Sequence, residues 1–239
     1  MIEALLASVQ ARDDIDPREL NALEGLAGET DKIAAKHVMV KRGEPLERSV
    51  LLTRGLMCRY KDLRNGRRQI SALHIAGDFV DLHGFTLKKL DHSVMALTEC
   101  RVVYVPHTRL EQLTADYPHL TRLLWLLTNV DAAIHREWEL SLGQRTGPAR
   151  AAQLFCELHA RMEVVGLVRG PVFDLRINQS ELGECLGMTG VHANRVLRAL
   201  RERGLADFRD GVVTLLDPAG LRRLADFDPA YLYIEKRTR

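Results

Sequence analysis

The stretch Ile177–Leu205, INQSELGECLGMTGVHANRVLRALRERGL, indicates two consecutive helices joined by a tight turn. Asn178 is placed to cap the first helix, and Glu181, three positions later, fits a variant of the capping box. Gly187 permits a sharp turn, because glycine tolerates backbone conformations that other residues avoid. An apolar first helix, a tight turn and a second helix with one apolar and one polar face make a helix-turn-helix. The stretch is therefore predicted to form this motif.

The apolar positions of this stretch fit the same motif. Those expected to pack inward are Leu182, Cys185, Leu186, Val191, Val196, Leu197 and Leu200. Val191 stands near the start of the second helix and could instead point outward. Downstream, residues 206–215 contain Asp210-Gly211, a dipeptide typical of a two-residue β-hairpin turn. A wing-like hairpin is expected there.

The second helix concentrates positive charge that the whole-chain balance conceals. Residues 188–203 carry four arginines against Glu202, a local excess of +3, while the whole chain has a net charge of +2. Such a helix can lie in the major groove of DNA, with its first turns at base edges and its later arginines near phosphates. The candidates for these contacts are Thr189, His192, Asn194, Arg195, Arg198 and Arg201. A solvated basic helix face is the alternative interpretation.

Upstream, residues 37–106 show short apolar runs separated by glycines, a pattern typical of an antiparallel β-barrel or jelly roll. Asn65-Gly66 lies between two alternating runs and predicts a hairpin, since both residues tolerate a positive φ. N-terminal to the barrel in the sequence, residues 2–26 have apolar positions at helical spacing, with Asp16-Pro17 as a predicted helix start. Two short helices are expected there.

Residues 119–145 predict one long helix between the two β-rich parts. Apolar residues in it step by three and four positions, the spacing of a coiled-coil seam. The predicted seam, and dimer interface, consists of Leu120, Leu123, Leu127, Val130 and Ile134. In the alternative interpretation this helix packs only on its own barrel. Thr146-Gly147-Pro148 interrupts the helix and is the expected hinge to the next one.

These patterns give an α+β chain of 239 residues with three predicted parts: a sensor domain at 1–118, a dimerisation helix at 119–145 and a DNA-binding domain at 146–239. Residues 1–10 lack a basic start, and no run of about 18 apolar residues occurs, so we expect a cytoplasmic protein without a membrane partner. The four cysteines are scattered, so no metal site is expected. No phosphate loop, GxSxG or HExxH motif is found, and we expect no enzyme.

The sequence resembles the Crp/Fnr family of bacterial transcription regulators from about Ile33 to Leu215. The resemblance rests on residues 50–80, VLLTRGLMCRYKDLRNGRRQISALHIAGDFV, on residues 146–158, TGPARAAQLFCEL, and on the helix-turn-helix stretch. It implies a cyclic-nucleotide-binding-type double-stranded barrel, a long dimerisation helix and a winged helix-turn-helix.

The resemblance also implies partners and residue roles. The partners would be double-stranded DNA with a near-palindromic site, a second copy of the chain, a small-molecule effector of unknown identity and, for an activator, RNA polymerase. Arg195 matches the family's recognition-helix arginine, while Gln179 and Ser180 fall where the first helix approaches DNA.

The expected effector pocket departs from the family pattern. Members that bind cyclic AMP carry Gly-Glu and Arg-Ser where this chain has Asp81-Leu82 and His92-Ser93, and hydroxyl residues where it has Ala133 and Ile134. An aspartate beside a missing arginine repels a phosphate, so cyclic AMP is not expected to bind.

No cofactor is predicted. The N-terminal cysteine cluster of iron–sulfur members is absent, because the first cysteine is Cys58. Haem stays an alternative by analogy with the family, and its candidate ligands are His74, His83, His92 and His107. The competing function is a ligand-sensing module that acts through protein contacts, against which the arginine-rich helix argues.

Overall fold

The computed structural model describes residues 2–237, which divide into two compact units. The first unit holds the chain up to Lys61, residues Leu73–Ala132 and the segment from Tyr233. The second holds Asp62–Ala72 and Ala133–Leu232. Helix α5, Pro118–Gln144, contributes its first part to one unit and the remainder to the other.

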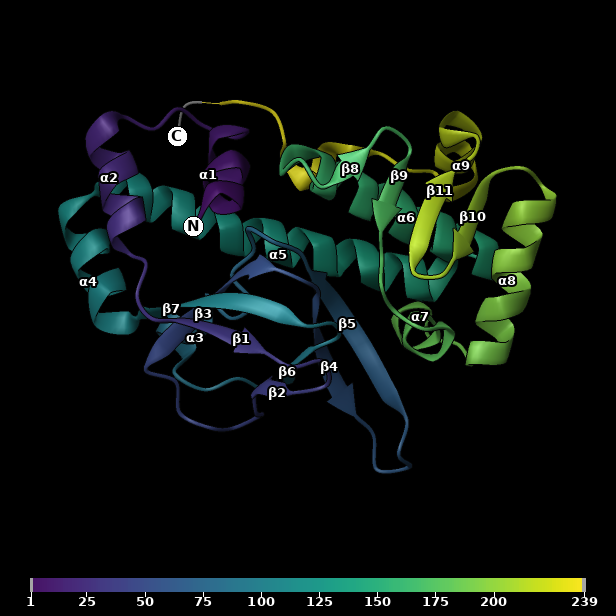
Figure 1. Cartoon of the computed structure of the whole chain (residues 1–239), viewed down its shortest axis with the longest axis horizontal. Coiled ribbons are helices and arrows are strands. Elements are labelled where there is room, and N and C mark those ends of the chain that lie inside the picture. The colour runs from purple at the N-terminus through teal and green to yellow at the C-terminus, as the bar shows by residue number, and fades with distance from the viewer. Residues whose placement is uncertain (1, 238–239) are drawn as a thin grey trace. The chain divides into compact units, whose positions relative to one another are not determined.

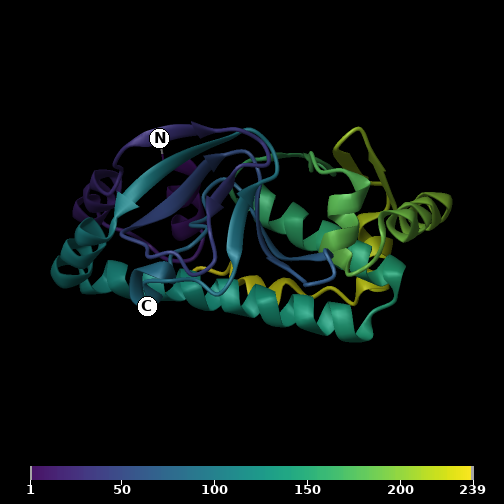
Figure 2. The same ribbon diagram turned by 90° about the horizontal axis from the view of Figure 1, so that it is seen from below.

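Two antiparallel sheets form the barrel of the first unit (Figures 1 and 2). One has the order β1-β7-β3, with bounds Thr30–Ile33, Cys100–Pro106 and Arg48–Arg54. The other has the order β2-β6-β4-β5, with bounds Val38–Val40, Ser93–Ala96, Met57–Asp62 and Arg68–His74. The barrel predicted for residues 37–106 is therefore confirmed.

Strand β3 supplies apolar side chains to both of its faces, because successive residues of a strand point to opposite sides. Val50 and Leu52 belong to the apolar cluster inside the barrel. Leu51 between them belongs to a second cluster that includes residues of the helices. Strand β7 divides in the same way, with Val102 in the first cluster and Val103 in the second. A continuous apolar run is thus what a strand covered on both faces requires.

The helices of this second cluster lie beside the strands of the first unit (Figure 1). They are α1, Glu3–Gln10, α2, Pro17–Gly25, α4, His107–Asp116, and the start of α5. Helix α2 begins where predicted, because the Asp16 carboxylate accepts hydrogen bonds from the N–H groups of Arg18 and Glu19.

The second unit combines helices with one antiparallel sheet of order β10-β11-β9-β8 (Figure 1). Its strands are Ala206–Arg209, Val212–Leu215, Val172–Asp174 and Val168–Arg169, in that order. Its helices after α5 are α6, Gly147–Val164, α7, Gln179–Leu186, α8, Gly190–Glu202, α9, Pro218–Ala225, and the short 3-10 helix Pro229–Leu232. The helix break predicted at Thr146-Gly147-Pro148 is confirmed, since Thr146 is the N-cap of α6.

The two predicted hairpin turns differ in the structure. At Asp210-Gly211 both residues have a positive φ, 51° and 76°, as a two-residue type I′ turn requires. At Asn65-Gly66 the predicted hairpin is confirmed, since β4 and β5 are neighbours in the sheet, but only Gly66 has a positive φ, 78°. The N–H of Leu63 donates to the carbonyl of Arg67, so the loop holds three residues and ends with glycine in the left-handed conformation.

Four of the five residues of the predicted dimer seam on α5 are buried in the single chain. Leu120, Leu123, Val130 and Ile134 are all less than 9% exposed in the single chain. Leu120 and Leu123 belong to the cluster between helices and barrel, and Leu127 packs against it. Periodicity alone cannot separate packing on the chain's own core from packing on a partner. The large apolar residues that α5 leaves exposed are Trp125 and Leu140, at 67% and 48%.

Four elements were missing from the sequence-based prediction. They are β1, α9, the 3-10 helix Pro229–Leu232 and the short helix α3, Gly84–Leu87. None of the helices within residues 2–237 combines the length and the apolar character that a membrane span requires.

Candidate nucleic-acid interface

Helix α7 begins at Gln179 because Asn178 caps it. The side-chain oxygen of Asn178 accepts a hydrogen bond from the Glu181 N–H at 2.9 Å, and the Glu181 carboxylate accepts one from the Asn178 N–H at 2.8 Å. These are the two reciprocal bonds of a capping box, which the sequence predicted. The helix ends at Gly187, whose φ of 65° lies in the left-handed region. The predicted turn at Gly187 is therefore confirmed.

A second glycine sets the close approach of α7 to α8. A Cβ atom at Gly183 would lie 2.6 Å from the carbonyl oxygen of Met188 and 3.1 Å from the backbone nitrogen of Gly190. Only glycine fits without a backbone shift. Gly183 was not among the residues singled out from the sequence, although a glycine inside a predicted helix is a recognised sign of close packing.

Helix α8 presents one polar face to solvent. Its buried side chains are Ala193, Val196, Leu197 and Leu200. Its exposed side chains include Val191, Asn194, Arg195 and Arg198, which recur at intervals of three and four residues and share one face. Val191 is 72% exposed, so it points outward rather than into the core. The open question about this residue is thereby settled.

The arginines of α8 differ in their partners. Arg198 pairs with Glu202 at 2.7 Å, and Arg201 lies 3.7 Å from Asp207 of β10. Arg195 makes no ion pair or side-chain hydrogen bond within residues 2–237. The Arg195 guanidinium is therefore free to contact another molecule. Arg198 and Arg201 would first have to leave their carboxylate partners.

A polar groove runs between the start of α7, helix α8 and the wing. Among its lining residues are Gln179 and Ser180 of α7, Asn194, Arg198 and Arg201 of α8, and the wing turn Asp210-Gly211. The structure thus brings five of the eight predicted DNA-contacting residues to one groove. Arg195 lies on the adjoining exposed face of α8.

Thr189 and His192 lie toward the turn between the helices. The Thr189 hydroxyl oxygen accepts a hydrogen bond from the His192 N–H at 3.3 Å and so caps α8. The His192 ring lies near the start of α6, because a Cβ atom at Gly147 would be 3.3 Å from its Nε2. Thr189 therefore has a structural role besides the predicted one.

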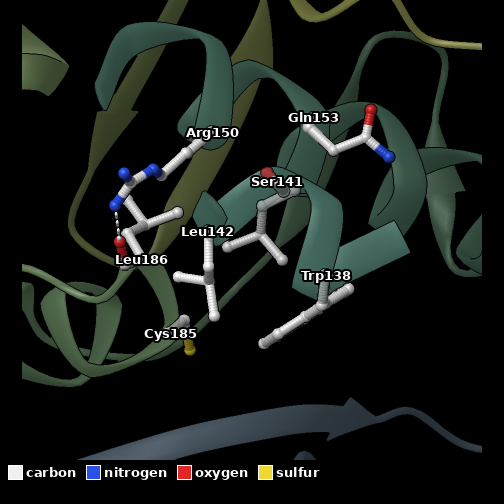
Figure 3. A pocket seen from close by; sticks show the side chains of 8 residues that line it. Trp138, Ser141, Leu142, Arg150, Gln153, Cys185 and Leu186 are labelled. Atoms are coloured by element: carbon white, nitrogen blue, oxygen red, sulfur yellow. Dashed lines mark hydrogen bonds between the residues drawn. The ribbon is translucent and has the colours of Figure 1, made fainter. Parts of the chain in front are cut away.

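A small pocket lies beneath the helix-turn-helix, where the end of α5, helix α6 and helix α7 meet (Figure 3). Trp138 and Leu142 of α5 line it opposite Cys185 of α7. Arg150 of α6 donates a hydrogen bond to the carbonyl of Leu186 at 3.0 Å (Figure 3). This hydrogen bond joins α7 to α6.

A buried carboxylate joins α6 to α5. Glu157 of α6 is fully buried, and it accepts hydrogen bonds from the Trp138 indole at 3.1 and 3.2 Å and from the Tyr231 hydroxyl at 3.0 Å. Arg161 contacts the same carboxylate at 3.0 Å. Burial raises the pKa of Glu157, while these partners oppose the rise.

The candidate effector residues of the barrel are mostly buried. Asp81 has no exposed surface; its Oδ1 accepts a hydrogen bond from the Val50 N–H at 2.7 Å, and its Oδ2 has no hydrogen-bond partner within the described residues. Burial raises the pKa of Asp81 to about 7, against the opposing effects of the Val50 N–H and of Arg59 and Arg48. Leu82 packs in the helix-facing apolar cluster.

The second pair of candidates is engaged by neighbouring residues. The Nδ1 atom of His92 lies 2.8 Å from Asp91, whose carboxylate also pairs with Lys61. The hydroxyl oxygen of Ser93 accepts a hydrogen bond from the Arg42 N–H at 3.1 Å. The serine of the family's Arg-Ser pair is present as Ser93, whereas His92 replaces the arginine.

Ala133 and Ile134 are buried and lie in the part of α5 that is counted with the second unit. A role of these two residues beside an effector stays a prediction.

The histidines considered for haem lie in different surroundings. His107 is 3.3 Å from the Ser49 hydroxyl, and His74 lies 4.0 Å from Asp78. The rings of His83 and His92 are 5.3 Å apart. Within residues 2–237, no three His, Cys, Asp or Glu side chains are grouped as metal ligands.

Comparison with known proteins identifies both parts of the chain. A family model described as a cyclic nucleotide-binding domain matches residues 30–117, and one described as a Crp-like helix-turn-helix domain matches residues 149–224. A probable transcriptional activator of Rhizobium leguminosarum bv. viciae is 30% identical over 193 residues, covering 78% of each chain. The chain belongs to the Crp/Fnr family.

Other relatives agree with this assignment. The transcriptional activator protein FnrA of Stutzerimonas stutzeri is 26% identical over 200 residues, which cover 78% of this chain and 82% of FnrA. The solved structure of FixK2 from Bradyrhizobium japonicum has a TM-score of 0.75 at 24% identity and covers 82% of this chain and 96% of FixK2. This likeness supports the fold.

The protein is therefore a transcription regulator of the Crp/Fnr type with a helix-turn-helix DNA-binding domain. Its family consists of regulators rather than enzymes. Double-stranded DNA is the partner that this domain implies.

Proposed function

We propose that this regulator binds a near-palindromic operator as a homodimer and reads base sequence through the first turns of α8. The exposed, unpaired Arg195 carries the proposal. An arginine can donate two hydrogen bonds to guanine, and this contact distinguishes guanine from the other bases. In a two-fold symmetric dimer the two copies of α8 would read half-sites about 10 base pairs apart.

The neighbouring residues have complementary roles in this proposal. Asn194 can pair with adenine through two hydrogen bonds, and the apolar Val191 can contact a thymine methyl group. Arg198 and Arg201, further along α8, would contact phosphates, as would the polar residues at the helix starts. These last residues are Gln179, Ser180, Thr189 and His192.

The exposed side of α5 is the proposed dimer interface. Trp125, Ala132 and Leu140 are exposed and follow one another at seven and eight residues, so they share a face of the helix. A tryptophan exposed to this extent gains most from burial against a partner, because its large apolar surface leaves water.

The sensor barrel is proposed to respond to something other than a cyclic nucleotide. A cyclic phosphate is an anion; His92 replaces the arginine that would pair with it, and the buried Asp81 offers no positive partner. An effector of other chemistry, and contact with RNA polymerase at promoters that the protein activates, complete the proposal.

Selection of bound sequences from a random duplex library tests the DNA-binding proposal. The wild type should enrich a two-fold symmetric motif. Arg195→Ala should lose about 1–3 kcal/mol per half-site and relax preference at one base position. Arg201→Ala should weaken binding to all sequences alike.

Failure to enrich any motif would contradict sequence-specific recognition and favour a module that acts through protein contacts. An Arg195→Ala variant with unchanged base preference would refute the proposed orientation of α8.

A further inference from the structure

The tip of the β4–β5 hairpin belongs to the same compact unit as the helix-turn-helix. Residues Asp62–Ala72 group with the second unit, although β4 and β5 are strands of the barrel sheet. The side-chain amide of Gln69 donates a hydrogen bond to the carbonyl of Glu184 in α7 at 2.7 Å. This bond holds the base of the tip against the first helix of the motif.

The tip carries two arginines without partners. Arg68 pairs with Asp62 at 2.8 Å, so that pair is neutral. Arg64 and Arg67 are exposed, and neither makes an ion pair or a side-chain hydrogen bond within residues 2–237. The turn that presents them is ordered, because the Asn65 side chain accepts a hydrogen bond from the Arg67 N–H at 3.1 Å.

The hairpin shares a groove with residues expected to meet DNA. Arg67 and Gln69 of the hairpin line this groove together with Ser180, Thr189 and His192. The last three are among the predicted DNA-contacting residues. The positive charge of the tip therefore adjoins the proposed interface rather than a remote surface.

We propose that Arg64 and Arg67 contact the sugar-phosphate backbone of the operator and extend the DNA interface beyond the winged helix-turn-helix. This inference rests on the proposed function, since it assigns further contacts to the same bound DNA. Exposed arginines without carboxylate partners suit phosphate oxygens, because no existing ion pair has to be broken. Contacts of this kind position a protein on DNA without reading its sequence.

The test is the salt dependence of operator binding by the full-length Arg64→Ala/Arg67→Ala variant. Each lost phosphate contact lowers the slope of log Kd against log salt by about 0.9. Two arginines in each of two subunits should therefore lower it by about 3.6, with the enriched motif unchanged. Hydroxyl-radical footprinting should show backbone positions that the wild type protects and the variant leaves open. The variant Arg64→Lys/Arg67→Lys should keep most of the slope.

The matched control is Arg18→Ala/Lys32→Ala, which removes the same charge from exposed positions of the first unit. If the hairpin variant keeps the wild-type slope and footprint, or if the control lowers the slope equally, the inference is overturned while operator binding stands. Absence of specific binding by the wild type would instead overturn the proposed function.

Discussion

Replacing Asp81 with asparagine should stabilise the barrel relative to the wild type, by an amount that grows as the pH rises. The variant keeps an oxygen that accepts the hydrogen bond from the Val50 N–H, which the wild-type carboxyl receives at 2.7 Å. It removes the carboxyl group, and the amide that replaces it does not ionise. The expected change in the free energy of unfolding is therefore a pH-dependent one.

The magnitude follows from the raised pKa. Burial raises the pKa of Asp81 from 3.8 to about 7 in the folded chain. The folded carboxyl then keeps a proton that the unfolded chain releases above about pH 4. The contribution of Asp81 to the free energy of unfolding is therefore complete below that pH. It is lost as the pH rises through about 7, and the full loss is about 4 kcal/mol.

Urea unfolding followed by tryptophan fluorescence at pH 5 and pH 8 measures this difference. The stability of Asp81→Asn relative to the wild type should rise by about 3 kcal/mol between these two values, because the unfolded carboxyl is already ionised there while the folded one keeps its proton until about pH 7. Asp116→Asn, at an exposed position of α4, is the control and should show no such rise. A relative stability of Asp81→Asn that is the same at both pH values would mean that Asp81 is already ionised beside Arg59 and Arg48, and would refute the reasoning.

Three further predictions address the dimer, the effector and the helix-turn-helix. Trp125→Asp should give monomers in analytical ultracentrifugation at micromolar concentration, because it puts a charge in the proposed interface. A variant that stays dimeric would show that the interface lies elsewhere. Isothermal titration should find cyclic AMP and cyclic GMP binding weaker than about 10 μM, or some 7 kcal/mol; tighter binding would show that Asp81 does not exclude a cyclic phosphate. Gly183→Ala should lower stability by about 1–3 kcal/mol through overpacking, whereas Gly143→Ala, with no neighbour within 4 Å, should not; equal thermal midpoints would contradict the close approach of α7 and α8.

The local signals of the sequence predicted most of the fold. The capping box at Asn178 and the turn at Asp210-Gly211 depend on residues close together in the chain, and both are found. The surface that covers the apolar stripe of α5 could not be predicted in this way. The spacing of apolar residues identifies the stripe, but the surface that covers it depends on tertiary structure. The exposed Trp125 marks a different side of the helix.

The candidate DNA interface was predictable in its residue types but not in its pairings. The four arginines of residues 188–203 suggested a uniform positive face, whereas Arg198 and Arg201 have carboxylate neighbours and Arg195 has none within the described chain. Asp207 comes from the wing, and only the folded hairpin brings it beside α8. Gln69 reaches Glu184 across 115 residues of sequence, a contact that no local pattern indicates.

Arg59, a charged residue inside the first unit, already has a partner of opposite charge. Arg59 is only 3% exposed, and its guanidinium pairs with Asp131 of α5 at 3.0 Å and donates to the carbonyl of Val80. A buried arginine that already has a carboxylate partner gains little from a second anion, and separating such a pair leaves an uncompensated charge. An anion that binds Arg59 would have to displace Asp131. A phosphate ester would therefore find no free positive partner in Arg59.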